Sequence, residues 1–561
     1  MRTATVVVMD RDLSGVLADP LGEPSEPPAP TTPARRRWGS VRASRTHPVV
    51  WVPALLVALA MLVPAAFLVV QASELSGERI QQLVTAPETL RLTGRTLLLA
   101  GSVTGASLLL GVPIAWLTVR SDLPGRRFFA VATALPLVIP TYVGAYALVA
   151  ALAPGGLVQD WFGFRPPSPY GFWAAFTALT LFTFPYVLLT VQAALRGLDP
   201  SLEEASRSLG RGPLVTFLRV TLPQLRPSAA AGGLLVTLYV LSDFGAVSML
   251  RYSTFTRAVY LQYRAAFDRA PAALLGVLLV AMTVVFLVLE ARVARDRGGQ
   301  FGIRGSGRAA SRVPLGRWRW PAVAFCSSVV IAGLVLPVSV LVSWLVRGLR
   351  GGEAFTAVAG PAGRSLLVAA LGALAAVACA VPIAVWAARS RSRLARLVER
   401  ASFTGYALPG IVVALALVYV GIRTVPALYQ TLAMLVFAYV VLFLPQAVGA
   451  VRTSLLQVNA NVEDAARMLG SSRLTTLRRV TLPLARRGAL AGGALVFLTA
   501  LKELPATLLL APTGYDTLAT RVWSATTEAF FARASLPALA LILLGSVPLA
   551  VSMIRERRER I

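Results

Sequence analysis

The chain has 561 residues, of which 56% are hydrophobic and only 14% are charged. Soluble domains usually carry about a quarter charged residues, so this composition excludes an ordinary soluble protein and indicates one whose main solvent is lipid. A formal charge of +28 would suggest nucleic-acid binding in a soluble protein. Here the excess comes from arginines clustered beside apolar stretches, and we therefore expect no nucleic-acid partner.

Residues 1–46 form a proline-rich segment that becomes basic just before the first long apolar stretch. The segment lacks the short basic start and the cleavage pattern of a signal peptide. We therefore expect a disordered cytoplasmic tail, followed by a first span that the protein retains.

Apolar stretches of helical length recur along the rest of the chain. A membrane-spanning helix needs about 20 mostly apolar residues, and a β-barrel strand would instead alternate apolar and polar positions over about ten residues. Roughly twelve stretches meet the helical criterion. They are 48–70, 92–118, 127–153, 171–195, 227–250, 271–291, 320–346, 364–388, 402–422, 427–451, 487–510 and 535–554. The sequence therefore predicts an all-α membrane protein.

The arginines are distributed unevenly among the loops. Under the positive-inside rule, loops rich in lysine and arginine lie in the cytoplasm. One topology, with both termini in the cytoplasm of a multi-pass cell-membrane protein, accommodates the basic clusters at 35–45, 120–127, 292–319, 389–400 and 555–560. The loop near 251–270 is the exception, because it would lie outside with four arginines: Arg251, Arg257, Arg264 and Arg269.

The second half of the chain repeats the first. Glu203-Glu-Ala-Ser-Arg-Ser-Leu-Gly210 is echoed by Glu463-Asp-Ala-Ala-Arg-Met-Leu-Gly470, and Val-Thr-Leu-Pro follows in both copies. The shift is 464 − 204 = 260 at the start and 483 − 223 = 260 at the final proline, so no gap intervenes. Val112-Pro-Ile-Ala115 and Val381-Pro-Ile-Ala384 match at a shift of 381 − 112 = 269. Each half therefore has about six spans, and an even number makes the repeats parallel.

Each repeated segment lies in a polar loop between the fourth and fifth predicted spans of its half. Ser201-Leu-Glu-Glu204 is typical of a capping box that opens a short helix, and Gly210 can supply the left-handed residue that ends it. A second short helix is expected through Phe217 and Leu218, with Pro223 as its stop. A single copy is compatible with an ordinary amphipathic loop, but two copies without a gap favour a rigid element that inserts into a partner.

These loops resemble the EAA loop of ABC importer permeases. Its pattern is an acidic residue, Ala, a small residue, three further residues and Gly, followed after nine more residues by hydrophobic-x-Leu-Pro. Both copies meet this pattern, at Glu204 to Pro223 and at Asp464 to Pro483. In that family the helix of the loop docks in a groove of the ATPase and transmits its movements to the membrane helices. The resemblance implies an ATPase dimer on the cytoplasmic side and a type I (MetI-like) fold in each half. The residues it assigns to the contact are Glu203, Glu204, Ala205, Gly210, Leu222, Pro223, Glu463, Asp464, Ala465, Gly470, Leu482 and Pro483. Asp464 replaces Glu in the second copy, which predicts two contacts of different strength.

The expected parts follow from the repeat and the resemblance. They are a tail at 1–46, a first repeat at 47–293 with its EAA loop near 199–225, an Arg/Gly-rich cytoplasmic linker at 294–319, a second repeat at 320–555 with its EAA loop near 459–485, and a basic C-terminal tail at 556–561.

The sequence contains no recognisable ATP-binding motif. A phosphate-binding Walker loop needs Gly-x-x-x-x-Gly-Lys, whereas the only lysine, Lys502, follows Leu501 within an apolar span. We therefore expect ATP to bind a separate subunit and this chain to hold no cofactor. Cys326 and Cys379 lie inside apolar spans, and the single histidine, His47, cannot support a histidine-rich metal site.

The fifth predicted span of each half contains charge. Asp243 lies in the first half and Lys502-Glu503 in the second, and 243 + 260 = 503 makes the two carboxylates equivalent. Such charges are costly in a bilayer unless they face protein or water, so they mark a transport pathway by default. Two alternatives stay open. Lys502 neutralises a carboxylate across the bundle, or both positions lie near the outer mouth and line a gate.

The residues around these charges resemble iron(III) ABC permeases. Ser242-Asp-Phe-Gly-Ala-Val247 is similar to their first half, and Lys502-Glu-Leu-Pro-Ala-Thr507 with Asp516-Thr-Leu-Ala-Thr-Arg-Val-Trp523 to their second. The resemblance covers about 50–555 and implies a permease that receives ferric iron from an extracytoplasmic binding protein. Carboxylates suit a hard cation, which agrees with that cargo.

Three other functions compete with this interpretation. An ABC permease for another solute, such as thiamine, a polyamine or a phosphonate, has the same architecture. An ion-gradient-driven secondary transporter also uses repeats and buried charges, but it has no need of two docking loops. An enzyme is disfavoured because the sequence offers no nucleophile–base or metal constellation.

Overall fold

The computed structural model describes residues 48–153, 156–163, 168–265, 270–295, 312–353, 358–390, 392–457 and 460–558. These residues fall within one unit, Arg45–Ile561. Within the described ranges the chain is helical apart from its connections and one isolated β-bridge, Ser121–Val313, which confirms the all-α prediction. The expected tail at 1–46 and most of the linker at 294–319 lie outside the described residues.

Ten helical segments of the described chain are long and apolar enough to cross a membrane, and a bent pair makes up to eleven. The ten are α1 (Pro48–Ala72), α3 (Pro87–Arg120), the span that begins with α5 (Thr141–Leu152), α7 (Phe172–Gly197), Phe217–Ser242, α13 (Ala270–Arg295), Gly316–Arg350, α16 (Ala359–Arg389), α19 (Leu432–Gln457) and Leu474–Leu501.

Four of the twelve predicted spans are broken in the structure. The span at 127–153 is divided into α4 (Arg126–Ala132), a tight turn η1 (Leu135–Val138) and α5. The one at 402–422 belongs to a pair of helical segments, Arg393–Tyr406 and Gly410–Arg423, bent by 105°. Proline explains both breaks, because it lacks an N–H and disfavours helical backbone in the residue before it. In the spans at 227–250 and 487–510, the long helices Leu222–Ser242 and Leu482–Leu501 end early and a short helix follows each. The span at 535–554 lies within the continuous helix α25 (Phe531–Arg558), so its helical prediction is confirmed.

The later elements of the two halves correspond and follow the same order, as the repeat predicts. The later elements of the first half are α8 (Ser201–Ser208), α9 (Pro213–Thr216), η2 (Phe217–Thr221), α10 (Leu222–Ser242), α11 (Gly245–Met249) and α12 (Phe255–Ala265). Their counterparts are α20 (Ala460–Met468), α21 (Arg473–Thr476), η7 (Leu477–Thr481), α22 (Leu482–Leu501), α23 (Pro505–Leu510) and α24 (Leu518–Thr527). The shift of 260 therefore describes a structural repeat as well as a sequence repeat.

Three long helices form the centre of each half. α3, α7 and α10 pack against one another in the first half, and α16, α19 and α22 do so in the second. Small residues allow the close approach. A Cβ atom built on Gly488 of α22 would lie 2.5 Å from the Cβ of Ser454 and 2.7 Å from the carbonyl oxygen of Ala450, both on α19.

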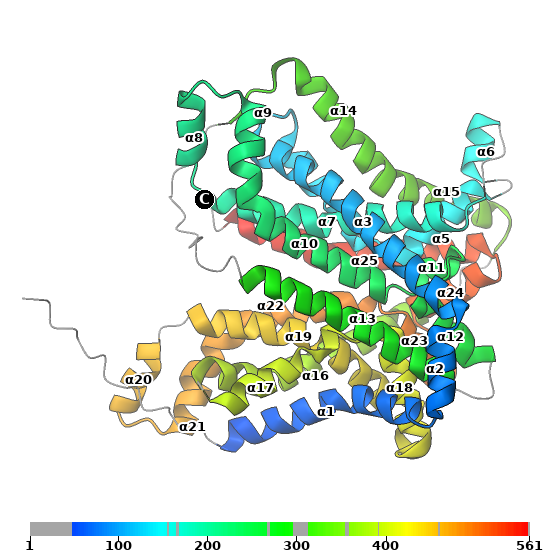
Figure 1. Ribbon diagram of the computed structural model, residues 1–561, viewed down its shortest axis with the longest axis vertical. Coiled ribbons are helices and arrows are strands. Elements are labelled where there is room, and N and C mark those ends of the chain that lie inside the picture. Colours follow the sequence, from blue (N-terminus) through cyan, green and yellow to red (C-terminus); the bar gives the residue numbers. More distant parts are fainter. Residues whose placement is uncertain are drawn as a thin grey trace, which may run out of the picture. The chain divides into compact units, whose positions relative to one another are not determined.

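The first span of each half packs against the other half. α1 lies against α16, α17 (Arg393–Ser402) and α18 (Gly410–Arg423), whereas α14 (Arg319–Val330) contacts α4 and α15 (Leu336–Arg350) contacts α5. Figure 1 shows this exchange: the blue α1 lies beside the yellow-green helices of the second half, and the green α14 lies beside the blue and cyan helices of the first. The two halves are therefore interlocked.

The loop near 251–270, which was the exception to the positive-inside rule, contains arginines that contact nearby aromatic side chains. The Arg251 guanidinium lies 4.4 Å from the ring centre of Tyr170, and Arg264 Nη1 donates to the Tyr260 hydroxyl at 3.2 Å. Burial and the nearby charge of Arg251 lower the pKa of Arg257. Arg269 lies outside the described residues.

The glycine contact between α19 and α22 is open to test. Replacing Gly488 by Ala forces a methyl group into the backbone of α19, and we expect the free energy of unfolding to fall by about 1–3 kcal/mol. The matched control is Gly449→Ala on α19, since a Cβ there would meet nothing within 4 Å. Thermal unfolding in detergent measures both. Equal stability of the two variants would contradict the proposed packing role.

Candidate functional site

A short surface helix ends at a left-handed glycine in each half. Gly210, after α8, has φ +78°, and Gly470, after α20, has φ +85°. This conformation favours glycine because a Cβ would crowd the following carbonyl. The predicted stop at Gly210 is confirmed, Gly470 has the same conformation in the second half, and a second short helix follows each of them.

The capping box predicted at Ser201–Glu204 is wrong. Pro200 occupies the N-cap position of α8 and makes no side-chain capping bond. Ser201 already lies inside the helix, and its backbone N–H donates to Asp199 Oδ1 at 3.0 Å. The aspartate two residues upstream therefore satisfies a backbone donor at the start of the helix, as Asp side chains do in such turns.

The predicted stop at Pro223 is also wrong, because the helix continues from α9 through η2 into α10. The five residues before Leu222 form a π-helical turn in which the Leu222 N–H donates to the Phe217 carbonyl. The proline thus falls at the junction of two hydrogen-bonding patterns, where its missing N–H is least disruptive. Leu482-Pro483 follows the same kind of turn, with the Leu482 N–H donating to the Leu477 carbonyl.

Glu203, predicted as a partner-contacting residue, is buried inside the protein. Its side chain is 7% exposed. The Thr221 hydroxyl donates to Glu203 Oε1 at 2.9 Å, and Arg120 Nε lies 3.7 Å from the same oxygen. Arg120 is the last residue of α3, and its Nη2 also donates to the Leu198 carbonyl at 3.3 Å.

Glu463 has the same surroundings in the second half. Its Oε1 accepts hydrogen bonds from Arg389 Nε at 3.1 Å, from Arg389 Nη2 at 2.8 Å and from the Thr481 hydroxyl at 3.0 Å. Arg389 is the last residue of α16. Sequence reasoning missed both arginines and both threonines, although Arg389 follows Arg120 by 269 residues and Thr481 follows Thr221 by 260.

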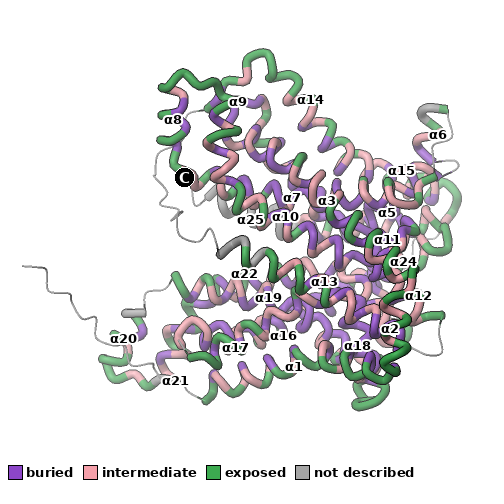
Figure 2. The backbone as a smooth tube through the Cα atoms, in the orientation of Figure 1, coloured by how far each residue is buried: buried purple, intermediate pink, exposed green. Residues whose placement is uncertain are grey.

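The residues next to these glutamates form the outer face of the loops. Ala205, Gly210, Asp464, Ala465, Gly470, Leu482 and Pro483 are exposed, whereas Glu204, Leu222 and Pro223 are partly buried. Sequence reasoning missed the most exposed apolar side chains of the loops: Leu209 (77%), Met468 (89%) and Leu469 (87%). Figure 2 shows much of α8 and most of α20 in the colour of exposed residues. Large apolar side chains exposed outside the long spans are typical of a protein-binding surface.

Asp243 and Glu503 both lie where the fifth span breaks. α10 ends at Ser242, and Asp243 Oδ1 then accepts from the backbone N–H groups of Ala246 at 3.0 Å and Val247 at 3.3 Å. Glu503 Oε1 accepts from the Ala506 N–H at 3.1 Å. Each carboxylate therefore satisfies the first backbone donors of the short helix that follows, α11 or α23.

Lys502 reaches across to the other half. Its Nζ donates to the carbonyl of Leu137 in η1 at 3.0 Å. Within the described ranges, it forms no ion pair with a carboxylate. The structure therefore does not show the neutralisation of a carboxylate by Lys502 that was one alternative.

Hydroxyl groups surround the two carboxylates. The Thr141 hydroxyl donates to Asp243 Oδ2 and lies 3.3 Å from the Tyr239 hydroxyl. Tyr239 is close enough to interact electrostatically with both Asp243 and Glu503, and Tyr142 with Glu503. The Tyr142 hydroxyl is buried and has no hydrogen-bond partner in the described part of the protein. The break of the fifth span is thus a polar region inside an apolar bundle, with oxygen atoms that suit a hard cation.

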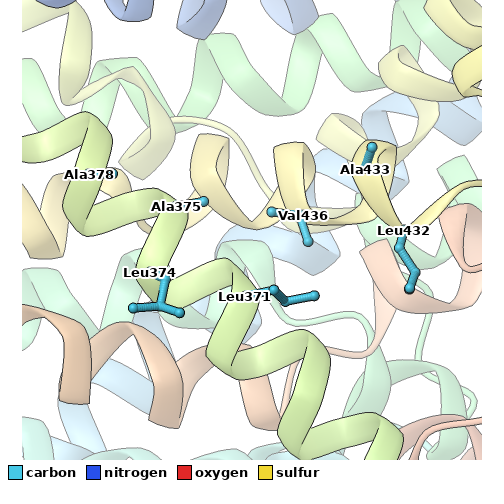
Figure 3. A pocket seen from close by; sticks show the side chains of 7 residues that line it. All are labelled: Leu371, Leu374, Ala375, Ala378, Leu432, Ala433 and Val436. Atoms are coloured by element: carbon cyan, nitrogen blue, oxygen red, sulfur yellow. The ribbon is translucent and has the colours of Figure 1, made fainter.

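Metal-ligating clusters and surface grooves also bear on where cargo could bind. Among the described residues, no group of three or more His, Cys, Asp or Glu side chains could hold a metal ion. The groove in Figure 3, of about 480 Å³, lies between α16 and α19 and is lined by Leu, Ala and Val side chains such as Leu371, Leu374 and Val436. Leu374 is 70% exposed, so we assign this groove to the lipid-facing surface.

The fold and the paired loops define a membrane permease of the binding-protein-dependent kind. Residues 107–298 and 380–559 each match the family described as binding-protein-dependent transport system inner membrane component. The chain belongs to this family, as a multi-pass membrane protein that contains the permease unit twice. Its relatives are transport subunits of ABC importers and not enzymes.

Individual relatives differ in how much of the chain they match. The Fe(3+)-transport system permease protein FbpB 2 of Haemophilus influenzae is 36% identical over 512 residues, which cover 90% of this chain and 97% of that protein. The molybdenum transport permease ModB of Escherichia coli is 31% identical over 207 residues, 35% of this chain and 90% of ModB. The sulfate transport permease CysT of the same species is 31% identical over 194 residues, 34% of this chain and 70% of CysT.

Proposed function

We propose that the chain moves ferric iron, delivered by an extracytoplasmic binding protein, into the cytoplasm. The observation that carries this proposal is similarity over nearly the whole length to a relative described as an Fe(3+) permease. The molybdenum and sulfate permeases match only about a third of the chain. The oxygen-rich break at Asp243 and Glu503 supports a hard cation as cargo.

Each EAA loop docks one ATPase subunit of a dimer. The exposed Leu209, Met468 and Leu469 supply apolar contacts, and Asp464 supplies a charge where the first loop has Glu204. The loops then lie in the cytoplasm together with both termini, which agrees with the distribution of arginines. ATP binds to the ATPase subunits and not to this chain.

Uptake of radioactive iron into vesicles tests the cargo. Vesicles that contain the permease, its ATPase and the binding protein should accumulate ferric iron only when ATP is supplied. ATP-dependent uptake of thiamine, a polyamine, molybdate or sulfate, with none of iron, would overturn the assignment. Gradient-driven uptake by this chain alone would instead support a secondary transporter.

The left-handed glycines give a test of coupling. A Cβ at Gly210 would meet nothing within 4 Å, so Gly210→Val causes backbone strain of about 1–2 kcal/mol rather than a clash. We expect ATP hydrolysis to continue while transport falls. Gly212→Val is the matched control, because its surroundings are equally open and its φ is not left-handed. Parallel assays of uptake and hydrolysis measure the effect, and normal coupling in Gly210→Val would contradict it.

The carboxylates at the break are tested by isosteric variants. Asp243→Asn and Glu503→Gln keep an oxygen for the helix caps but remove the charge, and we expect uptake to fall by about tenfold, or about 1.4 kcal/mol in barrier. Assembly with the ATPase should persist. Asp516→Asn serves as control, since Asp516 forms an exposed pair with Arg521 at 3.1 Å. Undiminished uptake in both pathway variants would assign the carboxylates to capping alone.

A further inference from the structure

We propose that two buried clusters, Arg120–Glu203–Thr221 and Arg389–Glu463–Thr481, are the joints that carry movement of each EAA helix into the membrane spans. We name them the first joint and the second joint. The inference rests on the proposed docking of α8 and α20 to the ATPase, and it assigns a positioning role to residues whose side chains face away from that partner.

Each joint fastens three separate elements at one carboxylate. The glutamate lies on the surface helix, and the arginine is the last residue of the second span. The threonine lies in the π-helical turn that leads into the fifth span. In both halves the second and fifth spans are two of the three helices that form the centre. A displacement of the surface helix therefore reaches this centre through the carboxylate.

The surface helices have few other attachments. α8 packs mainly against α9 and the π turn after it, and α20 against α21 and its own π turn. The arginine is thus the side-chain link from each surface helix to a span that does not follow it directly in the chain. The cluster is water-poor: Arg120 is 4% and Glu203 7% exposed, and Glu463 is 5% exposed. In the second joint the hydrogen bonds from Arg389 to Glu463 are charge-assisted, and such bonds are stronger in water-poor surroundings. In the first joint Arg120 and Glu203 form a buried ion pair at 3.7 Å.

The joints occur twice with the same construction. The glutamates and threonines are related by the shift of 260, and the arginines by the shift of 269 that also relates the Val-Pro-Ile-Ala motifs. Two copies of the same three residue types, placed on equivalent elements, indicate a shared requirement and not a local accident of packing.

The joints differ in tightness. Arg389 places two nitrogens within 3.1 Å of Glu463, whereas the nearest contact of Arg120 with Glu203 is 3.7 Å. In the first half the linker contributes instead: the Val313 N–H donates to the Arg120 carbonyl at 2.9 Å, and the Leu315 N–H to Asp122 Oδ1 at 2.8 Å. We choose the second joint for the experiment because its arginine donates hydrogen bonds directly to the glutamate.

The experiment measures solute moved per ATP hydrolysed by the complete complex in vesicles, with ferric iron as cargo. Glu463→Gln keeps the shape and removes the charge, and we expect this ratio to fall about fivefold or more, with normal ATPase binding and membrane abundance. Arg389→Gln should act alike, and the double variant should lose no more than the worse single variant because both break one link. Additive losses would overturn the joint.

The control is Glu399→Gln. Glu399 pairs with Arg452 at 2.8 Å in the same half, between α17 and α19, and does not touch the surface helix. It should keep the ratio of the unmodified chain. An equal fall in this control would show a general effect of lost ion pairs and would overturn the proposal. If Glu463→Gln fails to accumulate, Thr481→Val removes a single hydroxyl and should lower the ratio in the same direction; an unchanged ratio would count against the joint.

A second readout needs no cargo. With the ATPase subunits and a non-hydrolysable ATP analogue, hydrogen exchange at the end of α16 should change in the unmodified chain and not in Glu463→Gln. The same change in both would overturn the joint even if the cargo is not iron. Absence of iron uptake by the unmodified complex would instead overturn the proposed function alone.

Discussion

Hydrogen bonding of the backbone in lipid is the constraint on which the rest of this structure depends. A bilayer offers no water to an exposed N–H or C=O group, so each span has to satisfy its backbone internally. In the described part of the chain, several departures from regular helix occur where a substitute hydrogen-bonding pattern is present. Leu-Pro sequences follow π-helical turns, and the breaks at Asp243 and Glu503 occur where a carboxylate accepts from the next helix.

The need to satisfy backbone N–H groups also explains why charged side chains occur inside the bundle. Asp243 and Glu503 accept hydrogen bonds from the backbone at the start of the next helix, and these bonds stabilise the buried carboxylates. The Asp243 carboxylate also accepts a hydrogen bond from Thr141. The polar break joins elements of both halves, because Lys502, next to Glu503, donates to the Leu137 carbonyl of the first half. A pathway built at this position would therefore respond to movement of one half against the other.

Interlocking sets how the halves can move. α1 packs on the second half and α14–α15 on the first, so neither half can leave the other without carrying an exchanged helix with it. The surface helices α8 and α20 stand outside this exchange and connect to the central helices through their buried glutamates. The tightly packed central helices are thus distinct from the two attached surface helices. Such an arrangement suits a permease that is driven by a separate ATPase subunit.

The sequence by itself determined the helical class, the repeat, the glycine stop and the equivalence of Asp243 with Glu503. Composition, the length of apolar stretches and the shift of 260 can all be read from the order of residues without knowing which side chains meet. The sequence misplaced the cap at Ser201 and the stop at Pro223, since a neighbouring aspartate and a π turn changed the local rule. Only the tertiary structure decided that Glu203 and Glu463 face inward and that the first spans are exchanged. Their partners, Arg120 and Arg389, lie more than seventy residues away along the chain, and no local pattern reports which of two neighbouring acids will meet an arginine.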